Sequence, residues 1–489
     1  MDRITENETD FNTLEQWCYD MGMAFARKLM LLILGNLDDE ILKTRDKAVY
    51  RSKGFRTMTL KTLMGEVELP RRLYQTKTGT GERRHRYLLD EAIDLSTIGK
   101  ISMGLVSRIT ETITESSYRA TATAISHMTG QAISHTGVWN VVQETGEQLR
   151  EQDHKRGEAV KQCSGTGTKT VKALQEEFDG VWIHMQGKDR PKKKGSRGSR
   201  EMKLACAYEG VRFKGMDKNK EPLYGLVNPV YTSGFEKAAD FYEKKEGQLG
   251  SRYQLDEIQV RLLNGDGGGW VKGFGEKSGE TVYQQLDPFH IQKAIKRSKL
   301  PKAAQERIGT LWEAKKIPTL LRYLNLYVCK EIQGKKPGEK PGAIETLHQY
   351  LNQNRANLIP IHERELTLPE LGNDLLYGHM GAMESSVCGV IALRMKKRRA
   401  SFTIEGASNL GSLLCHKRNM ELEESIFSLG GMKLPMPMEE IITNVLSAAQ
   451  APKKEGMGYQ YPVMGGMPFE QSFITNGRRA VQYAAGYHW

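Results

Sequence analysis

Three carboxylates in the sequence have surroundings that suit catalysis. Asp179 lies between apolar residues in the string EEFDGVWIHMQ, where an unpaired carboxylate is costly to bury. Asp266 lies in the glycine-rich string NGDGGGW, and Glu384 lies in GAMES. Carboxylate oxygens suit Mg²⁺ and Mn²⁺, and two such ions about 4 Å apart can activate a water and stabilise the leaving oxygen of a phosphodiester. We expect these three residues to be catalytic and to bind two Mg²⁺ or Mn²⁺ ions.

Each carboxylate also has an ordinary interpretation. An Asp-Gly pair usually marks a turn, Asp266 fits a loop, and Glu384 fits the solvated face of a helix. The order of the surrounding elements favours the catalytic interpretation. Alternation of apolar residues predicts strands, and longer periodic segments predict helices. We expect strands at 177–186, 204–208 and 223–231, a helix at 235–248, strands at 258–263 and 282–286, and a basic helix at 287–299.

This is the element order of an RNase H-like fold. Asp179 then falls within the first strand, Asp266 at the end of the fourth, and Glu384 in a late helix. The predicted fold class is an α/β catalytic core, with an RNase H-like mixed sheet flanked by helices and a mainly helical N-terminal DNA-binding region. The core is expected at 171–300 and 377–420, divided by a helical insertion at 301–376.

The N-terminal part is predicted to contain three smaller units. Apolar residues at helical spacing from Phe11 to Leu32 predict an amphipathic packing or dimerisation helix within 1–50, which ends near Gly35. Alternation around a Met64-Gly65 turn predicts a basic β-hairpin within 51–100. Two helices joined at Gly130 give a helix-turn-helix outline within 101–162, either DNA-binding or part of an ordinary helical core. The small-residue segment 163–170 is expected to mark a domain boundary, and a Met-, Gly- and Pro-rich tail to occupy 421–489.

The composition of the chain favours some classes of binding partner over others. The chain has 71 Lys and Arg against 59 Asp and Glu, a net charge of +12, which favours a polyanion such as nucleic acid or an anionic membrane surface. The longest strongly apolar run, at 29–34, is too short for a membrane span, and the first ten residues do not form a secretory signal. The six cysteines form no C-x-x-C pair, which excludes the usual zinc ribbons and is typical of a reducing cytosol.

Several strings occur together in a specific order. They are SYR at 117–119, DGVWIHMQ at 179–186, GDGGGW at 265–270, LDPFH at 286–290 and GAMES at 381–385. With these strings the chain, from its N-terminal hairpin to about Leu410, resembles the ISLre-group bacterial insertion-sequence transposases. One departure is Phe402, where the family favours Trp after a basic run.

The resemblance implies an activity and a site. It identifies Asp179, Asp266 and Glu384 as the metal ligands of a DDE transposase, and it matches Asp287 and His290 to a D-x-x-H element that makes His290 a further catalytic residue. The implied function is to bind the terminal inverted repeats of an insertion sequence and to catalyse metal-dependent strand cleavage and strand transfer. The implied partners are double-stranded DNA, at transposon ends and target, and further copies in a homodimer or larger synaptic complex. No membrane partner is implied, and the expected location is the bacterial cytoplasm, at the nucleoid.

Basic residues are expected to position DNA through its phosphates, although any one basic run could be a plain solvated surface. The expected DNA contacts are Arg71, Arg72, Arg119, Lys192, Lys193, Lys194, Lys293, Lys296, Arg297, Lys396, Lys397, Arg398 and Arg399. Two other functions fit the sequence: a metal-dependent nuclease or resolvase that never joins strands, and a domesticated sequence-specific DNA-binding protein without catalysis.

Overall fold

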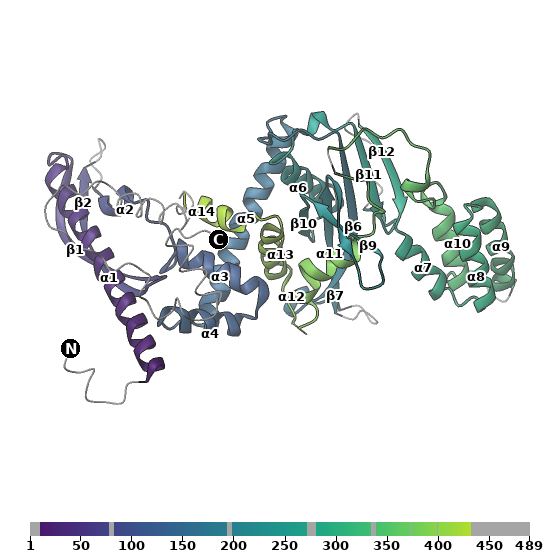
Figure 1. The fold of residues 1–489 in the computed structure, drawn as a ribbon. Coiled ribbons are helices and arrows are strands. Elements are labelled where there is room, and N and C mark those ends of the chain that lie inside the picture. The colour runs from purple at the N-terminus through teal and green to yellow at the C-terminus, as the bar shows by residue number, and fades with distance from the viewer. Residues whose placement is uncertain are drawn as a thin grey trace, which may run out of the picture. The chain divides into compact units, whose positions relative to one another are not determined.

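The computed structural model describes residues 10–77, 83–192, 198–270, 280–333, 339–372, 374–398 and 400–431 of the 489-residue chain (Figure 1). Three expected DNA contacts, Lys193, Lys194 and Arg399, lie outside these residues, as does the tail beyond Gly431. Within the described ranges, no helix combines the length and apolarity that crossing a lipid bilayer requires.

The N-terminal helix is longer than the sequence predicts. Helix α1 runs from Phe11 to Thr44, so the expected end near Gly35 is wrong. A glycine inside a helix costs only about 1 kcal/mol, and the turns beyond Gly35 are held to the following sheet. Asp38 is buried there, and its carboxylate lies 2.9 Å from the guanidinium of Arg72.

A five-stranded sheet follows α1, and it confirms the predicted hairpin. Its strands are β1 (Tyr50–Thr62), β2 (Gly65–Lys77), β3 (Arg83–Arg86), β4 (Thr97–Ile98) and β5 (Ile101–Ser102), in the order β3-β2-β1-β5-β4. Strands β1 and β2 pair in antiparallel fashion around the predicted turn, from Thr62 opposite Gly65 outward. The short helix α2 (Leu88–Ala92) lies between β3 and β4.

The predicted helix pair is confirmed, but its second helix is much longer than expected. Helix α3 (Met103–Glu115) precedes α4 (Tyr118–Thr129) and α5 (His135–Lys161). Gly130 ends α4 with φ of 62°, a left-handed conformation that glycine adopts without strain. The side chain of Ser134 caps α5 by accepting from the amide of Gly137. Val138, Val141 and Val142 of α5 are buried, so one face of this helix belongs to the hydrophobic core.

The central sheet has mixed strand directions. Its strands are β6 (Ala173–His184), β7 (Ser199–Tyr208), β10 (Val230–Gly234), β11 (Val260–Gly265) and β12 (Thr281–Leu286), in the order β10-β7-β6-β11-β12. Strands β6, β7 and β10 are antiparallel neighbours, whereas β11 is parallel to both β6 and β12. Helix α6 (Ala238–Gly250) lies between β10 and β11 in the chain, as predicted.

The third predicted strand, 223–231, is wrong as a single element. Its first part belongs to β9 (Pro222–Val227), which pairs with β8 (Gly210–Met216) in a separate two-stranded hairpin. Only its end joins the central sheet, as part of β10. Asn228 separates the two parts with φ of 51°, a backbone conformation that Asn tolerates better than most residues and that interrupts an extended strand.

The insertion is helical over only part of its predicted length. Helices α7 (Pro288–Arg297), α8 (Lys302–Glu313), α9 (Ile317–Gln333) and α10 (Ala343–Gln353) lie next to one another (Figure 1). They share one hydrophobic cluster, which also includes Leu286 at the end of β12. Beyond Gln353 the helical prediction is wrong. Among the described residues from 354 to 376, the helical elements are two short 3₁₀ turns, Arg355–Asn357 and Ile361–Glu363, and the segment contains Pro360 and Pro369.

The late helix that carries Glu384 is short and irregular. Helix α11 (Met383–Ser386) continues into a π-helical segment, Val387–Ala392, and then into α12 (Leu393–Met395). Helix α13 (Ile404–Arg418) and helix α14 (Leu422–Leu429) follow, so the expected tail begins with a helix.

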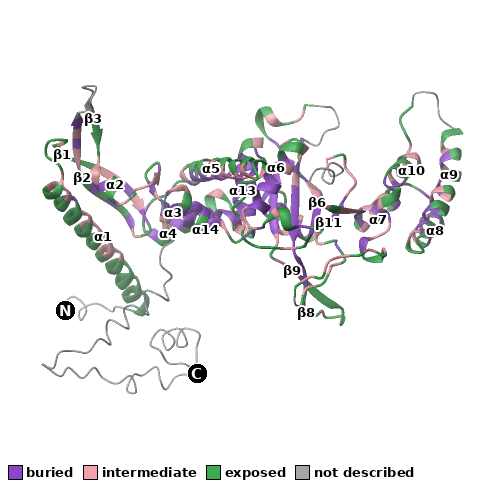
Figure 2. Ribbon diagram, turned by 90° about the horizontal axis from the view of Figure 1, so that it is seen from above, coloured by how far each residue is buried: buried purple, intermediate pink, exposed green. Residues whose placement is uncertain are grey.

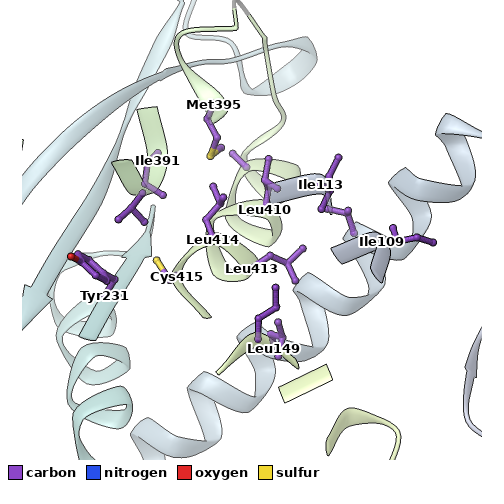
Figure 3. Packing of buried hydrophobic residues seen from close by; sticks show 14 of the residues in the cluster. Ile109, Ile113, Leu149, Tyr231, Ile391, Met395, Leu410, Leu413, Leu414 and Cys415 are labelled. Atoms are coloured by element: carbon purple, nitrogen blue, oxygen red, sulfur yellow. The ribbon is translucent and has the colours of Figure 1, made fainter. Parts of the chain in front are cut away.

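One hydrophobic core extends across the expected boundary at 163–170. It contains residues of α3, α5, β6, β7 and α13. Figure 3 shows Leu410 and Leu413 of α13 among side chains such as Ile113 of α3 and Leu149 of α5. The helix-pair region and the central sheet therefore fold as parts of one unit.

Polar groups on α13 meet a buried carboxylate of α5. His416 Nε2 lies 3.1 Å from Asp153 Oδ1, and Gln248 of α6 donates to the same oxygen. Burial acts to raise the pKa of Asp153, but the nearby charges of His416, Lys244 and Arg156 outweigh it and hold the pKa below its usual value. This network joins three helices of the core.

The Asp153 network predicts an acid-sensitive contribution to stability. We expect Asp153→Asn to lower the free energy of unfolding at pH 7 by about 3 to 5 kcal/mol, because it breaks a buried charged pair. A carboxyl whose pKa is lower in the folded state stabilises above its unfolded pKa of about 4, and the contribution is lost as pH falls through the folded value. The difference between variant and parent should therefore shrink toward about pH 3.

Urea unfolding at a series of pH values measures this difference. Glu151→Gln is the matched control, because Glu151 lies on the same helix but is exposed, and its ion-pair partner among the described residues is the exposed Lys155. An Asp153→Asn loss that stays constant down to pH 3 would contradict the assignment.

Candidate active site

Two of the three expected carboxylates lie on neighbouring strands. Strands β6 and β11 are parallel, and their pairing ends with Gly265 opposite Phe178. Asp266 and Asp179 are the next residues after this pair, so they lie at the same end of the pairing. A backbone amide holds each side chain: Gly180 N donates to Asp179 Oδ1 at 2.7 Å, and Gly268 N donates to Asp266 Oδ1 at 2.8 Å. Strand register thus brings together two residues that are 87 positions apart in the sequence.

The segment before Glu384 is fixed to the same face of β6. Alternate side chains of a strand share one face, so Gln175, Glu177 and Asp179 point the same way. Gln175 Oε1 accepts from the amide of Gly378 at 2.9 Å, and Glu177 Oε1 accepts from the amide of Ala382 at 3.2 Å. These contacts bring α11 and Glu384 to the side of the sheet where Asp179 lies.

Glu177 is a buried carboxylate that sequence reasoning missed. Besides Ala382, it accepts from the hydroxyl of Tyr208 at 2.7 Å and from the amide of Asn264 at 3.1 Å. Burial raises the pKa of Glu177, and these hydrogen bonds offset only part of the increase. The sequence did contain one indication of this role, because Glu177 lies two residues before Asp179 in the predicted strand and therefore on the same face.

His290 approaches the carboxylates from the first turn of α7. Asp287 caps this helix and binds His290 Nδ1 through Oδ2 at 2.7 Å. His290 Nε2 then lies 3.8 Å from Asp179 Oδ1. The hydrogen bond with Asp287, followed by the charge of Asp179, raises the pKa of His290 despite its partial burial. The D-x-x-H spacing therefore orients the imidazole toward the carboxylates and favours its charged form.

All four expected catalytic residues line one cavity of about 1300 Å³. Burial raises the pKa of Asp179; Gly180 and His290 oppose this increase, whereas the charges of Asp266 and Glu384 add to it. Within the described part of the chain, however, no three His, Cys, Asp or Glu side chains lie close enough together to form a metal site. The carboxylates thus line the same cavity but do not form a preorganised metal site in this structure.

Two further side chains reach this cavity without having been predicted. Glu201 of β7 lines it, and its carboxylate covers Gly180, where a Cβ would collide with it. Burial raises the pKa of Glu201, and the charges of Asp266 and Asp179 add to the increase. Tyr350 of α10 donates its hydroxyl to the backbone oxygen of Asp266 at 2.9 Å. Nothing in the sequence around Tyr350 indicates this contact, because it depends on how the insertion packs.

The ten expected DNA contacts within the described residues fall into four groups. Lys293, Arg297 and Lys396 line the cavity with the carboxylates. Arg119, Lys192 and Lys296 are exposed elsewhere on the surface. Lys397 donates to Cys388 Sγ at 3.2 Å, and Arg398 donates to the backbone oxygen of Glu115.

Arg71 and Arg72 have structural partners instead of an open surface. Arg71 pairs with Asp90, and its guanidinium lies 3.8 Å from the ring centroid of Tyr87. Arg72 pairs with Asp38 and with Asp39, at 2.9 and 2.7 Å. Their charges are largely used within the N-terminal region, so they contribute little to an exposed basic surface.

The role of Glu177 in positioning Glu384 can be tested directly. Glu177→Ala leaves the amide of Ala382 without its acceptor, and losing about 1 to 3 kcal/mol of local stability should speed its exchange about tenfold or more. Hydrogen–deuterium exchange of peptides covering 376–384 measures the effect. Glu257→Ala, at an exposed position, is the control. Unchanged exchange in the Glu177 variant would mean that the segment is held by other contacts.

Two proteins that are similar to this chain come from Caldanaerobacter subterraneus subsp. tengcongensis. The UPF0236 protein TTE2489 is 23% identical over 283 residues, which cover 57% of this chain and 54% of the relative. A second UPF0236 protein, whose name combines eleven labels from TTE0033 to TTE2212, is 24% identical over 283 residues, 57% of this chain and 53% of the relative. The matches thus span about half the length of these curated relatives. Residues 4–421 match the sequence profile of the Uncharacterised protein family (UPF0236), and the chain therefore belongs to that family.

Proposed function

We propose that this protein is a DDE transposase of the ISLre group, which cleaves DNA at the ends of an insertion sequence and joins the freed strand to a target. One observation carries the proposal. Asp179, Asp266 and Glu384 come from three separate elements and line one cavity, together with Lys293, Arg297 and Lys396. Carboxylates next to cations suit a reaction on a phosphodiester, in which the cations hold the DNA backbone.

The sheet supports an RNase H-like core as part of this proposal. Three antiparallel strands, β10, β7 and β6, continue into the parallel strands β11 and β12. This order agrees with the arrangement expected for that fold. It also accounts for the distance in sequence between Asp179 and Asp266, since neighbouring parallel strands require a crossover connection.

The cavity has the donor chemistry for Mg²⁺ or Mn²⁺. Burial raises the pKa of Asp179, and the charges of Asp266 and Glu384 add to the increase; a divalent cation between the carboxylates would relieve this repulsion. We propose that Asp179, Asp266 and Glu384 bind the metal ions. Measurement of Mg²⁺ or Mn²⁺ binding tests this assignment most directly. When bound, such ions activate the attacking oxygen and stabilise the leaving oxygen of the phosphodiester.

His290 and the nearby cations have a complementary role. Asp287 fixes the imidazole through Nδ1, so Nε2 faces the carboxylates and can hold a proton there. Lys293 and Arg297 follow on the same helix and line the same cavity. Helix α7 thus presents positive charge opposite the carboxylates, which allows a phosphate group to be bound between the two.

The names of the relatives support a mobile element. One relative carries eleven locus labels and another carries four. We interpret these labels as repeated genes in one genome, a pattern that transposition would produce. The partners in this proposal are the DNA of the element's ends and of the target, and the site of action is the bacterial nucleoid in the cytoplasm. A nuclease or resolvase, or a DNA-binding protein without catalysis, is the alternative.

Conservative substitution of the carboxylates tests the catalytic assignment. We expect Asp179→Asn, Asp266→Asn and Glu384→Gln each to reduce strand cleavage to background, because an amide is a much poorer metal ligand than a carboxylate. Binding of the same DNA in metal-free gel shifts should persist. The substrate is a labelled duplex with the DNA that flanks the coding sequence, assayed with Mg²⁺ or Mn²⁺. Asp256→Asn is the matched control, because Asp256 is exposed and lies in the 3₁₀ turn Leu255–Glu257.

The same assay separates the alternatives. Joining of the cleaved 3′ end to a second duplex distinguishes a transposase from a nuclease or resolvase. Binding of DNA without cleavage in the parent protein would favour the non-catalytic alternative. Cleavage that survives all three substitutions would exclude the proposed site.

Helix α1 is the surface that we propose for self-association. An exposed series of apolar residues follows it at intervals of three or four, the spacing of a coiled-coil seam. The series is Phe11, Leu14, Cys18, Met21, Phe25, Leu29 and Leu32. Phe11, Phe25 and Leu32 are 73%, 67% and 61% exposed, and Figure 2 shows most of α1 in the exposed colour.

This proposal predicts that charge in the seam prevents dimer formation. Phe25→Glu combined with Leu32→Glu should change the mass in light scattering from twice the chain mass to the chain mass, because burying two unpaired carboxylates is unfavourable. Leu326→Glu, at an equally exposed position on α9, is the control. A parent protein that is already monomeric, or a double variant that remains dimeric, would contradict the assignment of α1.

A further inference from the structure

The hairpin of β8 and β9 lies outside the central sheet and has no role in the site described above. Its strands pair from Gly210 opposite Val227 to Met216 opposite Pro222, with an irregularity between Phe213 and Gly215. Its tip is ordered by Asp217, whose Oδ1 accepts from the amides of Asn219 and Glu221 at 2.7 and 2.8 Å. The hairpin is thus a defined structure and not a loose connection.

Large apolar side chains on this hairpin are exposed. Phe213 and Tyr224 are opposite each other in the strand register, with ring centroids 6.0 Å apart in an edge-to-face arrangement. Phe213 is 50% exposed, Tyr224 is 47% exposed, and Met216 is 61% exposed. Figure 2 shows β8 mainly in the exposed colour. In an edge-to-face pair one ring contacts its neighbour with its edge, which leaves part of the aromatic surface open to a further planar group.

Cations accompany these aromatic residues. Arg212, Lys214, Lys218 and Lys220 are all exposed, and none has an ion-pair partner within the residues that the structure describes. The hairpin has only two acidic residues, Asp217 and Glu221, and the turn amides already occupy Asp217. The result is a small element that combines open aromatic rings with unneutralised positive charge.

The base of the hairpin is joined to the chain that leads to Glu384. Val211 and Leu376 exchange two backbone hydrogen bonds, both of 2.9 Å. Two residues later, the amide of Gly378 donates to Gln175 of β6. A ligand on the hairpin would therefore bind to an element that is directly connected to the catalytic segment.

We propose that the β8–β9 hairpin is a binding site for single-stranded DNA. Phe213 and Tyr224 stack on unpaired bases, and Lys214, Lys218 and Lys220 contact the phosphates. Aromatic stacking with a basic surface is the general mode of binding to single strands, whereas the centre of a protein–protein interface is depleted of lysine. The inference deepens the proposed function, because transposition produces unpaired strands at the cut ends.

Fluorescence anisotropy with a labelled oligo-dT tests the hairpin. An oligonucleotide of about 20 nucleotides is long enough to span one or more binding sites of this kind. The full chain is used without added metal. Phe213→Ala combined with Tyr224→Ala should weaken binding about tenfold or more, since stacking on one aromatic residue contributes about 1 to 3 kcal/mol. Leu326→Ala, which removes an equally exposed apolar side chain from α9, should leave affinity unchanged.

A second set of variants tests the cations independently. Changing Lys214, Lys218 and Lys220 together to Gln should reduce the slope of log affinity against log salt by about 2, because each phosphate contact on a single strand contributes about 0.7. Lys302→Gln, at an exposed position on α8, should not change the slope. This arm remains informative even if the aromatic variant fails to fold.

The outcomes distinguish this inference from the proposed function. Parent-like affinity in the aromatic variant, or an unchanged salt slope in the lysine variant, overturns the hairpin proposal. So does a hairpin variant that loses self-association but keeps its DNA affinity, which would make the hairpin a protein interface. The Asp179→Asn variant should bind oligo-dT like the parent. If the hairpin variants lose binding while the parent cleaves no DNA, the hairpin proposal holds and the proposed activity fails.

Discussion

The carboxylate of Glu177 is in contact with hydrogen-bond donors from three different elements. Tyr208 reaches it from β7, Asn264 from β11, and the amide of Ala382 from the segment that carries Glu384. A buried carboxylate without such partners would be strongly destabilising, so these elements are constrained to meet at one point. Since Asp179 lies two residues further along the same face of β6, the arrangement of the candidate active site follows from this contact.

The opposite face of β6 has a charged interior of its own. Glu176 binds Arg261 of β11 at 2.7 Å and also pairs with Lys245 of α6, while Glu246 binds the same two cations. These cations overcome the effect of burial and lower the pKa of Glu246 to about 2. Buried ion pairs add little net stability, but they impose strict geometry. We infer that their main effect is to fix the register of β11 beside β6, which is what aligns Asp266 with Asp179.

The sequence predicted those features that depend on local pattern. Strands β6, β11 and β12 and the basic helix that begins at Asp287 were accessible from alternation and spacing. The grouping of Asp179, Asp266 and Glu384 rested on the expected order of elements together with the family resemblance, and the resemblance alone implied a role for His290. The features that the sequence did not predict depend on distant contacts. The left-handed backbone of Asn228 divides an apolar run that looks like one strand, and the partners of Arg72 become visible only when α1 packs on β2. Tyr350 likewise reaches Asp266 only through the packing of the insertion.

A backbone hydrogen bond joins the two walls of the cavity. The amide of Asp287 donates to the carbonyl of Gly265 at 2.8 Å, so α7 begins in direct contact with the end of β11. Asp266 follows Gly265 in the chain, and Lys293 and Arg297 follow Asp287 on one helix. The separation between the carboxylates and the cations is therefore set by the sheet and the first turns of α7. A change that moved Lys293 and Arg297 would also displace His290 from Asp179, so under the proposed function the contact with DNA and the catalytic site would shift together.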